Sequence, residues 1–570
     1  MKNSHFIIPF LLLSILLPSF SASAQDRTVG LIFSKEGASN GYTLFAPMSS
    51  TTTYLIDGEG RTVRTWESQY RPGLSVYLLE SGNLLRTAND RSNQGGTVFG
   101  TTGGVGGLVQ EFDWEGNLVW EYPYSSSTYR QHHDIERLPN GNVLMIAWEV
   151  KSSEEAIGAG RNPSLLPDNQ LWPDHIIEVE PVGQSEGKIV WEWHAWDHLV
   201  QEYDPTKENY GVVSAHPELI DLNRVTANGS ADWLHTNSID YNPTLDQILL
   251  SLHNLNEIWI IDHSTTTEEA ATHTGGKSGR GGDILYRWGN PANYGAGSAE
   301  DQQLFSQHDA EWIAPDLPGA GHILTFNNGV RRPDGNYSSV DEIVPPYTPE
   351  GTYTRVEGTA YGPEEILWSY TASNPTDFYS SNISGAGRLP SGNTLICEGD
   401  NGRFFEVLPT GEIVWEYINP VIASGPLTQG SSIPVGMGGG TANTVFRADH
   451  YAPDYAGFVG RDLTPGDFIE RYSSGVVQSD SKGELRMTII PQPLWERGTI
   501  QLELSHPATL SMALFNSVGS EVLQVVEGRE VGAGSHAIPI ALSSIPSGWY
   551  FCKVTLNDKV EMMPCLVVKE

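Results

Sequence analysis

The sequence predicts an all-β protein: a six-bladed β-propeller followed by a small C-terminal β-sandwich. A strand-like phrase that ends in tryptophan recurs six times between Gly60 and Trp415. Helical periodicity is nearly absent beyond the N-terminus, and 60 glycines and 35 prolines supply turns. A ring of four-stranded units buries such repeats without leaving an open sheet edge.

The repeated phrase is a polar turn followed by an apolar run, and it ends at Trp66, Trp120, Trp191, Trp288, Trp368 and Trp415. These tryptophans are 47 to 97 residues apart, whereas a bare four-stranded blade needs about 40–45 residues. The surplus predicts inserted loops, the largest between Trp191 and Trp288. We expect the tryptophans to pack between blades, and residues 41–57 and 443–451 to supply the strands that close the ring.

The N-terminus is typical of a secretory signal peptide over residues 1–24. Lys2 is followed by an apolar run from Phe6 to Leu17 and by the small-residue pattern Ala22-Ser-Ala24. The run is too short to span a bilayer, and no later stretch is apolar enough. We therefore expect a mature chain without a transmembrane segment that is secreted or held at the cell surface, by way of the periplasm.

The mature chain divides into a propeller over residues 25–469, a linker over 470–485 and a β-sandwich over 486–570. The linker assignment depends on the Ser- and Gly-rich stretch 473–483. Within the sandwich, ordered features are Pro491-Gln-Pro493, Leu514–Gly519, Ile545–Phe551 and Lys569. These resemble the C-terminal sorting domain of type nine secretion cargo, which implies passage through outer-membrane secretion machinery. An ordinary adhesive module is the alternative.

Charge and cysteine content restrict the partners. A formal net charge of −36 argues against nucleic acid and anionic membranes, and it requires a local basic pocket for any anionic substrate. The cysteines are Cys397, Cys552 and Cys565, and no pair has metal-site spacing. Cys552 and Cys565 either form a disulfide across neighbouring strands or remain buried thiols.

Three histidines occupy similar places in the repeat. His133, His235 and His308 each precede a strand that we expect to be innermost in its blade, so they should converge on the central channel. Asn237, two residues after His235, faces the same side of its strand. Imidazole can act as a nucleophile, a proton shuttle or a metal ligand.

Four phrases around these histidines resemble the bacterial aryl-sulfate sulfotransferase family, and the likeness extends over roughly residues 41–462. The phrases are Asp232–Ile239, Ile248–Asn254, Gln307–Ala310 and Ile323–Gly329. The resemblance implies an exported six-bladed propeller that moves a sulfuryl group from a phenolic sulfate ester to a phenolic acceptor. It also implies a ping-pong route through a sulfohistidine, without a nucleotide, a metal or another cofactor.

The same resemblance assigns roles to individual residues. His308 matches the histidine that becomes sulfated. His235 and Asn237 match the pair that holds the sulfuryl oxygens and assists proton transfer. His133 matches an earlier site histidine, and its neighbour His132 stays open as an alternative.

One position departs from the family pattern, because His253 stands where the family carries an arginine. Histidine is charged only when protonated, whereas arginine always is. Either His253 acts as an imidazolium beside a bound sulfate, or Arg331, Arg332 or Arg447 lends the charge from another loop, or catalysis has been lost or redirected.

Other interpretations remain. Trp196, in an aromatic stretch over 191–198, either stacks on phenolic rings at the channel mouth or packs within a blade. His198, His253 and Asp197 form an alternative metal-ligand set. The competing functions are an aryl sulfate hydrolase, which uses water as the acceptor, and a non-catalytic ligand-binding or adhesive surface propeller.

Overall fold

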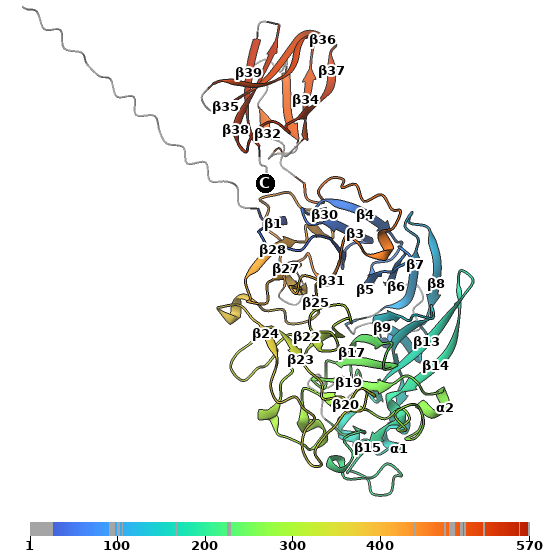
Figure 1. Cartoon of the computed structure of the whole chain (residues 1–570). Helices are drawn as coiled ribbons and strands as arrows, with labels where there is room; N and C mark the ends of the chain where they lie inside the picture. The colour runs from blue at the N-terminus through green and yellow to red at the C-terminus, as the bar shows by residue number, and fades with distance from the viewer. Residues whose placement is uncertain are drawn as a thin grey trace, which may run out of the picture.

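The computed structural model describes residues 27–90, 97–99, 103–104, 106–166, 168–224, 230–436, 440–471, 475–477, 485–490, 494, 497–516, 519–557 and 559–567. The expected signal peptide lies outside the described residues, as do Pro491–Pro493 and Lys569 of the C-terminal resemblance. Over the described chain the all-β prediction is confirmed, since antiparallel sheets dominate and helices are few and short (Figure 1).

Within the described residues up to Arg471, six large antiparallel sheets follow one another along the chain. The first contains β31 (Val445–Tyr451), β2 (Tyr42–Pro47), β3 (Thr52–Asp57) and β4 (Thr62–Glu67). The second contains β5 (Pro72–Leu78), β6 (Leu84–Asn89), β7 (Gly107–Phe112) and β8 (Leu118–Pro123). The third contains β9 (Tyr129–Arg137), β10 (Val143–Glu149), β13 (Asp174–Val182) and β14 (Glu186–His194).

The remaining three sheets repeat this order. The fourth contains β17 (Thr236–Asn242), β18 (Gln247–Leu252), β19 (Glu257–Asp262) and β20 (Tyr286–Trp288). The fifth contains β21 (His308–Trp312), β22 (Ile323–Asn327), β23 (Ser339–Ile343) and β24 (Trp368–Tyr370). The sixth contains β25 (Gly385–Arg388), β26 (Thr394–Glu398), β27 (Arg403–Val407), β28 (Ile413–Ile418) and β1 (Gly30–Ser34).

The insertions between these strands carry the short elements. The helices are α1 (Ser153–Gly158) and α2 (Thr267–Ala270). The two-stranded pairs are β11 (Lys151–Ser152) with β12 (Gln170–Leu171), β15 (Leu199–Val200) with β16 (Ile220–Asp221), and β29 (Val421–Ile422) with β30 (Gly425–Pro426). Single 3₁₀ turns cover Thr97–Phe99, Pro163–Leu165, Ala195–Asp197, Val213–Ala215, Pro291–Tyr294, Ala299–Asp301, Pro375–Asp377, Gly399–Asn401 and Ala456–Phe458.

The first strand of each sheet packs against the first strands of two other sheets. These contacts run in a cycle through β5, β9, β17, β21, β25 and β31 and back to β5; we call these six the inner strands. Middle strands such as β18 and β19 are buried along their whole length, whereas the outer strand β14 alternates between exposed and covered residues. A continuous apolar run fits a strand that is covered on both faces.

The six repeated tryptophans lie on the fourth strand of each sheet, and each indole Nε1 donates to the segment that joins the third and fourth strands of the next sheet or, at Glu186, to the first residue of that fourth strand. The bonds run from Trp66 to Asp113, Trp120 to Glu186, Trp191 to Thr265, Trp288 to Pro363, Trp368 to Pro409 and Trp415 to Gly58, over 2.8 to 3.1 Å. The last bond returns from the sixth sheet to the first. The tryptophans thus join neighbouring sheets, as the sequence predicts.

The first and last strands before Arg471, β1 and β31, each pair with a strand that is far away in the sequence. β31 pairs with β2, so the expected pairing of residues 443–451 with 41–57 is observed. β1 adds a fifth strand to the outer edge of the sixth sheet beside β28. β1 is not evident from the sequence, because Gly30–Ser34 is too short to stand out as a repeat.

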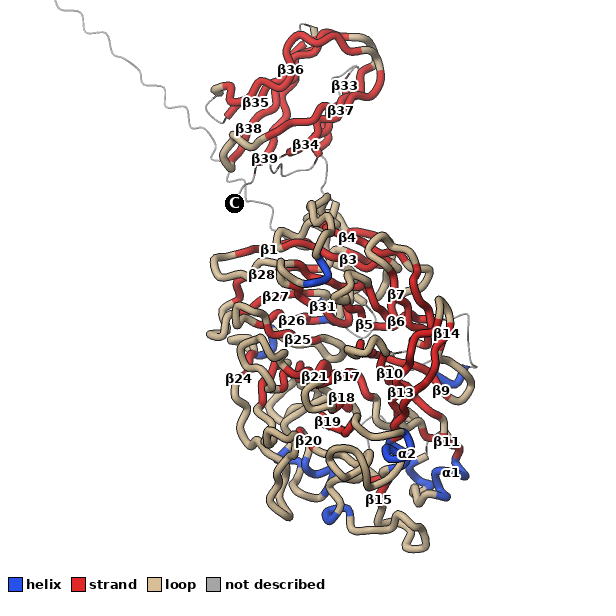
Figure 2. The backbone as a smooth tube through the Cα atoms, turned by 45° about the vertical axis from the view of Figure 1, so that its right-hand side comes forward, coloured by secondary structure: helices blue, strands red, loops and turns tan. Residues whose placement is uncertain are grey.

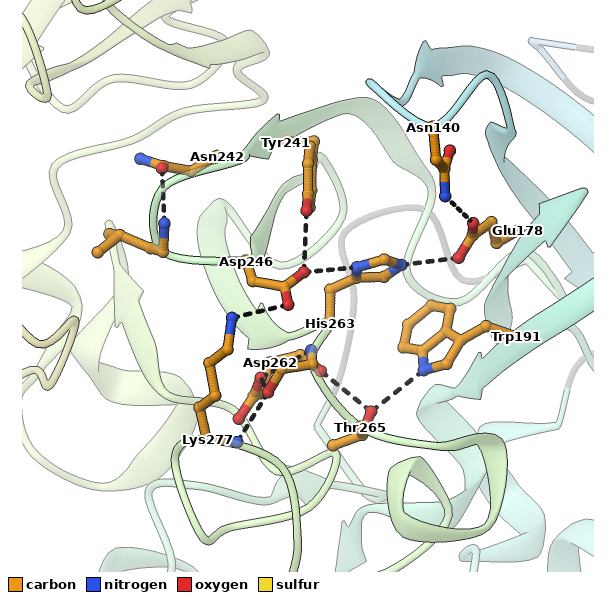
Figure 3. A network of polar contacts seen from close by, with 12 residues as sticks. Asn140, Glu178, Trp191, Tyr241, Asn242, Asp246, Asp262, His263, Thr265 and Lys277 are labelled. Carbon is orange, nitrogen blue, oxygen red and sulfur yellow. Dashed lines mark hydrogen bonds and ion pairs between the residues drawn. The ribbon is translucent and has the colours of Figure 1, made fainter.

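A polar network also joins the third and fourth sheets (Figure 3). His263, which follows β19, places Nδ1 2.9 Å from Asp246 Oδ1 and Nε2 3.0 Å from Glu178 Oε2 of β13. Tyr241 and Lys277 donate to the same Asp246 carboxylate. Burial alone would lower the pKa of His263, but its hydrogen bonds to the two carboxylates raise it to about 9. The network therefore holds a positive charge between the two sheets.

The C-terminal part contains two four-stranded sheets around one apolar core. One contains β32 (Gly475–Val477), β33 (Leu485–Ile490), β34 (Arg497–Leu504) and β37 (Gly534–Ala541). The other contains β36 (Glu521–Val531), β35 (Ala508–Asn516), β38 (Gly548–Leu556) and β39 (Lys559–Val567). In Figure 2 these strands form a group of their own.

The boundaries differ from the expected linker at both ends. Ile469 belongs to an apolar cluster that includes β31, and Arg471 donates its backbone N–H to the Leu427 carbonyl, so the first part extends through Arg471. Residues 475–477, expected as linker, form β32 and pair with β33. Backbone pairing has thus overridden the Ser- and Gly-rich composition.

The three cysteines are free and buried. On the paired strands β38 and β39, Cys552 lies opposite Met563, and Cys565 lies opposite Tyr550. The two thiols are therefore diagonal neighbours rather than direct cross-strand partners, and the free-thiol alternative is the one observed. Among the described residues, the structure contains no helix with the length and apolarity that crossing a membrane requires.

Candidate active site

Bulges at the start of three inner strands aim polar side chains at one place. The register of β9 against β10 shifts between Met145 and Ala147. The registers of β17 against β18 and of β21 against β22 shift at Asn237 and Asp309. His133 and His235 have φ values of 51° and 54°, in the left-handed region. Bulges re-aim side chains, and such backbone strain concentrates at functional sites.

The predicted histidines meet there in a continuous row. Ring centroids are 4.5 Å apart for His133 and His235, 5.1 Å for His235 and His253, and 5.3 Å for His253 and His308. His133 comes from the third sheet, His235 and His253 from the fourth, and His308 from the fifth. Residues 175 positions apart in the chain therefore lie around one point, as the sequence analysis predicts; we call them the imidazole row.

An apolar cluster completes the surroundings of this row. The Phe446 ring lies 6.2 Å from that of His133 and 6.5 Å from that of His308. Phe446 packs with Leu74, Ile383 and, at the margin, Met48. These side chains come from the sixth, first and second sheets, so half of the site is imidazole and half is apolar. Sequence reasoning missed this half, although Phe446 and Leu74 also lie in irregular starts of inner strands.

The hydrogen bonds of His308 define its tautomer. Its Nδ1 lies 2.8 Å from Asn328 Oδ1, and Asn328 Nδ2 donates to the carbonyls of Ser380 and Ile383. Two carbonyl acceptors fix the orientation of the Asn328 amide, so Oδ1 faces His308 and Nδ1 carries the hydrogen. Burial and the neighbouring His253 hold the pKa of His308 well below 6.5. A neutral ring with a lone pair on Nε2 results, which is the form that a nucleophile needs.

His235 has the opposite character. Its Nδ1 lies 2.5 Å from Asp232 Oδ2, and Asp232 also accepts from Trp148 Nε1 at 3.0 Å. Burial alone would lower the pKa of His235, but the Asp232 carboxylate raises it. The same pair lowers the pKa of Asp232 against the effect of its burial. His235 is therefore the member of the row that is best suited to carry a proton.

The other two members of the row are neutral. Burial, followed by the charge of His235, lowers the pKa of His253 to about 4 and that of His133 well below 6.5. His253 Nδ1 lies 2.9 Å from Asn254 Oδ1, and Asn254 Nδ2 donates to the Asp232 carbonyl. That second bond fixes the Asn254 amide, so the His253 Nδ1 carries its hydrogen.

His132, the open alternative to His133, faces elsewhere. Its ring stacks on Trp148 at 3.9 Å, and its Nε2 lies 3.4 Å from Asp174 Oδ1. Its Nδ1 contacts His133 Nδ1 at 2.7 Å. His133 is the residue whose ring contacts the ring of His235, and His132 contacts His133 through its Nδ1.

The loop before β7 approaches His133 at a glycine. His133 N–H donates to the Gly104 carbonyl at 2.9 Å, and Gly104 has φ +85°. A Cβ at this position would overlap the His133 imidazole. Gly104 thus contributes a backbone contact to the site.

Two other predicted residues hold the strands together. Asn237 is fully buried and donates from Nδ2 to the carbonyl of Gln307, the residue before His308. Arg447 forms ion pairs with Asp134 at 3.0 Å and Asp309 at 2.9 Å. These carboxylates belong to the residues that follow His133 and His308, so Arg447 links the first sheet to the third and fifth.

The structure does not bring Arg331 or Trp196 into contact with the row. Arg331 is exposed in the loop after β22, where its backbone N–H donates to Asn336. Trp196 lies in the 3₁₀ turn after the outer strand β14, with Lys151 Nζ 5.3 Å from its ring centroid. The loops after β22 and β14 place Arg331 and Trp196 away from the row. The spacing of these residues in the sequence does not reveal this position.

A family model for arylsulfotransferases matches residues 36–418, which is more than half of the chain. The chain belongs to the arylsulfotransferase family. The match contains all four histidines of the row but ends before β31, so it leaves out Phe446 and Arg447. Family membership makes the chain a sulfotransferase and implies a phenolic sulfate donor and a phenolic acceptor.

Comparisons beyond the family model are distant. No curated protein matches the chain. A protein of unknown function from Bacteroides caccae has a TM-score of 0.35 at 11% identity, covering 66% of this chain and 93% of that one. Streptogramin B lyase has a TM-score of 0.32 at 12% identity, covering 70% and 84%. Virginiamycin B lyase from Staphylococcus aureus has a TM-score of 0.30 at 10% identity, covering 69% and 85%. TM-scores this low carry no argument about function.

Proposed function

We propose that this arylsulfotransferase works by a ping-pong mechanism in which His308 carries the sulfuryl group between two phenols. The observation that carries the proposal is the state of His308: its Nδ1 hydrogen is held by Asn328, it is neutral, and three further imidazoles stand in line with it. Sulfuryl transfer leaves little covalent work to the enzyme, so a positioned nucleophile and stabilised oxygens supply most of the rate.

In the first half-reaction, His308 Nε2 attacks sulfur and the bond from sulfur to the aryl oxygen breaks with its electron pair. The leaving phenolate takes the Nε2 proton of the His235 imidazolium, which Asp232 stabilises. His308 then carries a positive ring and a negative sulfo group, and the Asn328 oxygen stabilises the Nδ1 hydrogen of that ring. No nucleotide donor takes part.

In the second half-reaction, an acceptor phenol returns a proton to His235 Nε2 while its oxygen attacks sulfur. The bond from nitrogen to sulfur breaks, and its electron pair restores the lone pair of His308. Proton transfer by a positioned imidazole contributes typically 10²–10⁴-fold to such a step. Both half-reactions use the same groups, so one site serves the donor and the acceptor in turn.

The division of the site into two halves supports an aryl substrate. An aryl sulfate has one apolar and one anionic end, and the cluster of Phe446, Leu74 and Ile383 offers an apolar surface beside the imidazole row. We propose that the ring of the phenol packs on this cluster while the sulfate lies against the row. In a chain with a formal net charge of −36, the His235 imidazolium supplies the local positive charge.

In this proposal His253 takes the place of the family arginine only when it is protonated, because the one N–H of its neutral ring already donates to Asn254 Oδ1. Its pKa is lowered to about 4, so a bound sulfate must raise it before it can act as a cation. Arg447 does not lend its charge directly, since Asp134 and Asp309 already neutralise it. Asn237, bonded to the carbonyl before His308, acts as a positioning residue.

The finer architecture belongs to the same proposal. We propose that the six sheets form a closed six-bladed propeller; the cyclic contacts of the inner strands and the cycle of tryptophan bonds support this. The C-terminal sheets would form a β-sandwich that directs type nine secretion after the signal peptide has been removed. The mature protein would then act outside the cytoplasm, at the cell surface or released.

A chromogenic aryl sulfate, supplied with and without a phenol, tests the activity. Release of the chromophore should increase when the phenol is added. Release that is independent of the phenol would indicate the hydrolase, and no release in either case would indicate the binding propeller.

His308→Ala tests the covalent step. The variant should lose turnover, and the wild type treated with donor alone should gain about 80 Da at His308, the mass of a sulfuryl group. His322→Ala is the matched control, since His322 lies in the same sheet and bonds to Glu342 away from the row. Full activity in His308→Ala would overturn the mechanism.

A further inference from the structure

A second group of histidines lies apart from the imidazole row, beside the outer strand of the third sheet. His198 follows the 3₁₀ turn after β14, whereas His273 and Asp283 lie in the segment that joins α2 to β20. His198 Nδ1 is 2.9 Å and His273 Nδ1 is 2.7 Å from the same oxygen, Asp283 Oδ1. Helix α2 lies beside β14 and is in contact with it (Figure 1).

The ring of His198 is held rigidly from three sides. Its Nε2 lies 2.8 Å from the Ala270 carbonyl, and its face stacks on Trp193 with 5.7 Å between centroids. Trp193 Nε1 donates to the Gly282 carbonyl at 2.7 Å. A Cβ on Gly282 would lie 2.6 Å from His198 Nε2, so glycine is needed where the chain passes this ring. A buried imidazole fixed in this way is a preorganised ligand.

The bonding pattern demands a positive charge between His198 and Asp283. The Ala270 carbonyl only accepts, so His198 Nε2 carries a hydrogen and the lone pair of a neutral ring lies on Nδ1. That lone pair faces a carboxylate oxygen, and the oxygen also meets the Nδ1 of a second imidazole. Two such acceptors attract each other only through a cation, which is either an extra proton or a metal ion.

We propose that His198, His273 and Asp283 bind a divalent transition-metal ion, for which Zn²⁺ is the probe. Two imidazoles and one carboxylate form a common zinc ligand set, and a backbone carbonyl on the second nitrogen of a ligating histidine is its usual support. Among the described residues, these three bring their ligand atoms within 4.8 Å of one another. Neighbouring ligand atoms in a tetrahedral zinc site are about 3.3 Å apart. The two distances from a histidine Nδ1 to Asp283 Oδ1, which are 2.9 and 2.7 Å, must therefore lengthen by a few tenths of an ångström when the ion binds.

The site differs from the ligand set expected from the sequence, because His198 joins Asp283 and His273 rather than Asp197 and His253. His253 belongs to the imidazole row. The side chain of His273 is 59% exposed, which gives an ion a path to the site and leaves a position for water. The ion would fasten the segment between α2 and β20 to the third sheet, and it would take no part in sulfuryl transfer.

Zinc titration of the chelator-treated full-length protein by calorimetry tests the proposal. The wild type should bind a Zn²⁺ equivalent that His273→Ala loses, and Zn²⁺ should raise the thermal midpoint of the wild type but not of this variant. His273 is exposed, so its removal leaves the buried packing in place. His216→Ala is the matched control, because His216 is also exposed and bonds to a carboxylate, Glu218.

Zinc bound at the imidazole row would give a different result. The Zn²⁺ equivalent bound at the row would still be measured in His273→Ala and would be absent in His253→Ala. Retention of the full wild-type stoichiometry in His273→Ala, or no zinc binding by the wild type, would overturn the proposal and leave an extra proton on His198 as the compensating charge.

Discussion

At the residue scale, the site gives chemically identical side chains different surroundings. His308 and His235 are both imidazoles among other imidazoles, yet one bonds to an amide oxygen and the other to a carboxylate. Burial and the neighbouring His253 hold the pKa of His308 well below 6.5 despite its bond to the amide, whereas the carboxylate raises the pKa of His235. Two titratable groups whose surroundings move their pKa values apart are typical of a nucleophile and a proton donor.

Asp232→Asn tests this division. Removing the carboxylate charge lowers the pKa of His235, so the alkaline limb of the profile of kcat against pH should move to lower pH. At neutral pH we expect kcat to fall by about 10–100-fold, which is at or below the lower end of the roughly 10²–10⁴-fold that a positioned proton donor contributes, because His235 itself remains in place. The amide that replaces the carboxylate would keep an oxygen for the Trp148 indole, so the fold should survive. Asp197→Asn, at an exposed carboxylate, is the control, and an unmoved alkaline limb would contradict the assignment.

At the element scale, short irregularities in the inner strands position the histidines. Bulges at the start of β9, β17 and β21 bring the row together, and Arg447 ties the residues after His133 and His308 to β31. The outer strands hold their neighbours through the tryptophan bonds, and the network around His263 adds a charged link between β13 and β19 (Figure 3).

The His263 link predicts a pH dependence of stability. A pKa raised from 6.5 to about 9 in the folded protein stabilises the fold fully below about pH 6.5, and this stabilisation is lost as the pH rises through about 9. Its size is on the order of 3 kcal/mol. The thermal midpoint of the wild type should therefore fall between about pH 6.5 and about pH 9.5, and His263→Gln should lack this component.

The control for this experiment is His216→Gln, whose histidine side chain is 44% exposed. It should keep the wild-type profile. Parallel profiles for the wild type and His263→Gln would show that the charge between the sheets contributes nothing to stability.

At the scale of the whole molecule, no apolar cluster of the described residues combines side chains from before Arg471 with side chains of the C-terminal sheets. The four histidines, Asp232 and Phe446 all lie before Arg471, whereas the C-terminal sheets bury their apolar residues against each other. The first part depends on its last strand, because β31 pairs with β2 and supplies both Phe446 and Arg447.

A chain that ends after Arg471 should therefore keep kcat within about twofold of the full-length value, because no group of the site is removed. A chain that ends at residue 442 should lose activity and cooperative unfolding together, since it lacks β31. Activity assays and thermal melts of the two truncated proteins check this. Inactivity of the longer one in a folded state would show that the C-terminal part contributes to catalysis.

The sequence by itself determined the all-β class, the repeat and the histidines that meet in the imidazole row. It did so because tryptophan and histidine recur in phase with the strands, and a repeat places equivalent positions at equivalent points of the fold. The family likeness then separated His308 from its neighbours.

Only the tertiary structure decided which contacts hold those residues and in which direction their pKa values shift. Asp232 raises the pKa of His235 and Asn328 holds the Nδ1 hydrogen of His308, yet nothing in the local sequence marks either residue as the partner of an imidazole. Arg447 and Trp196 look suited to bind substrate, but folding commits one to two carboxylates and leaves the other beside an outer strand. Protonation and access depend on the atoms within a few ångströms, and those come from segments far apart in the chain.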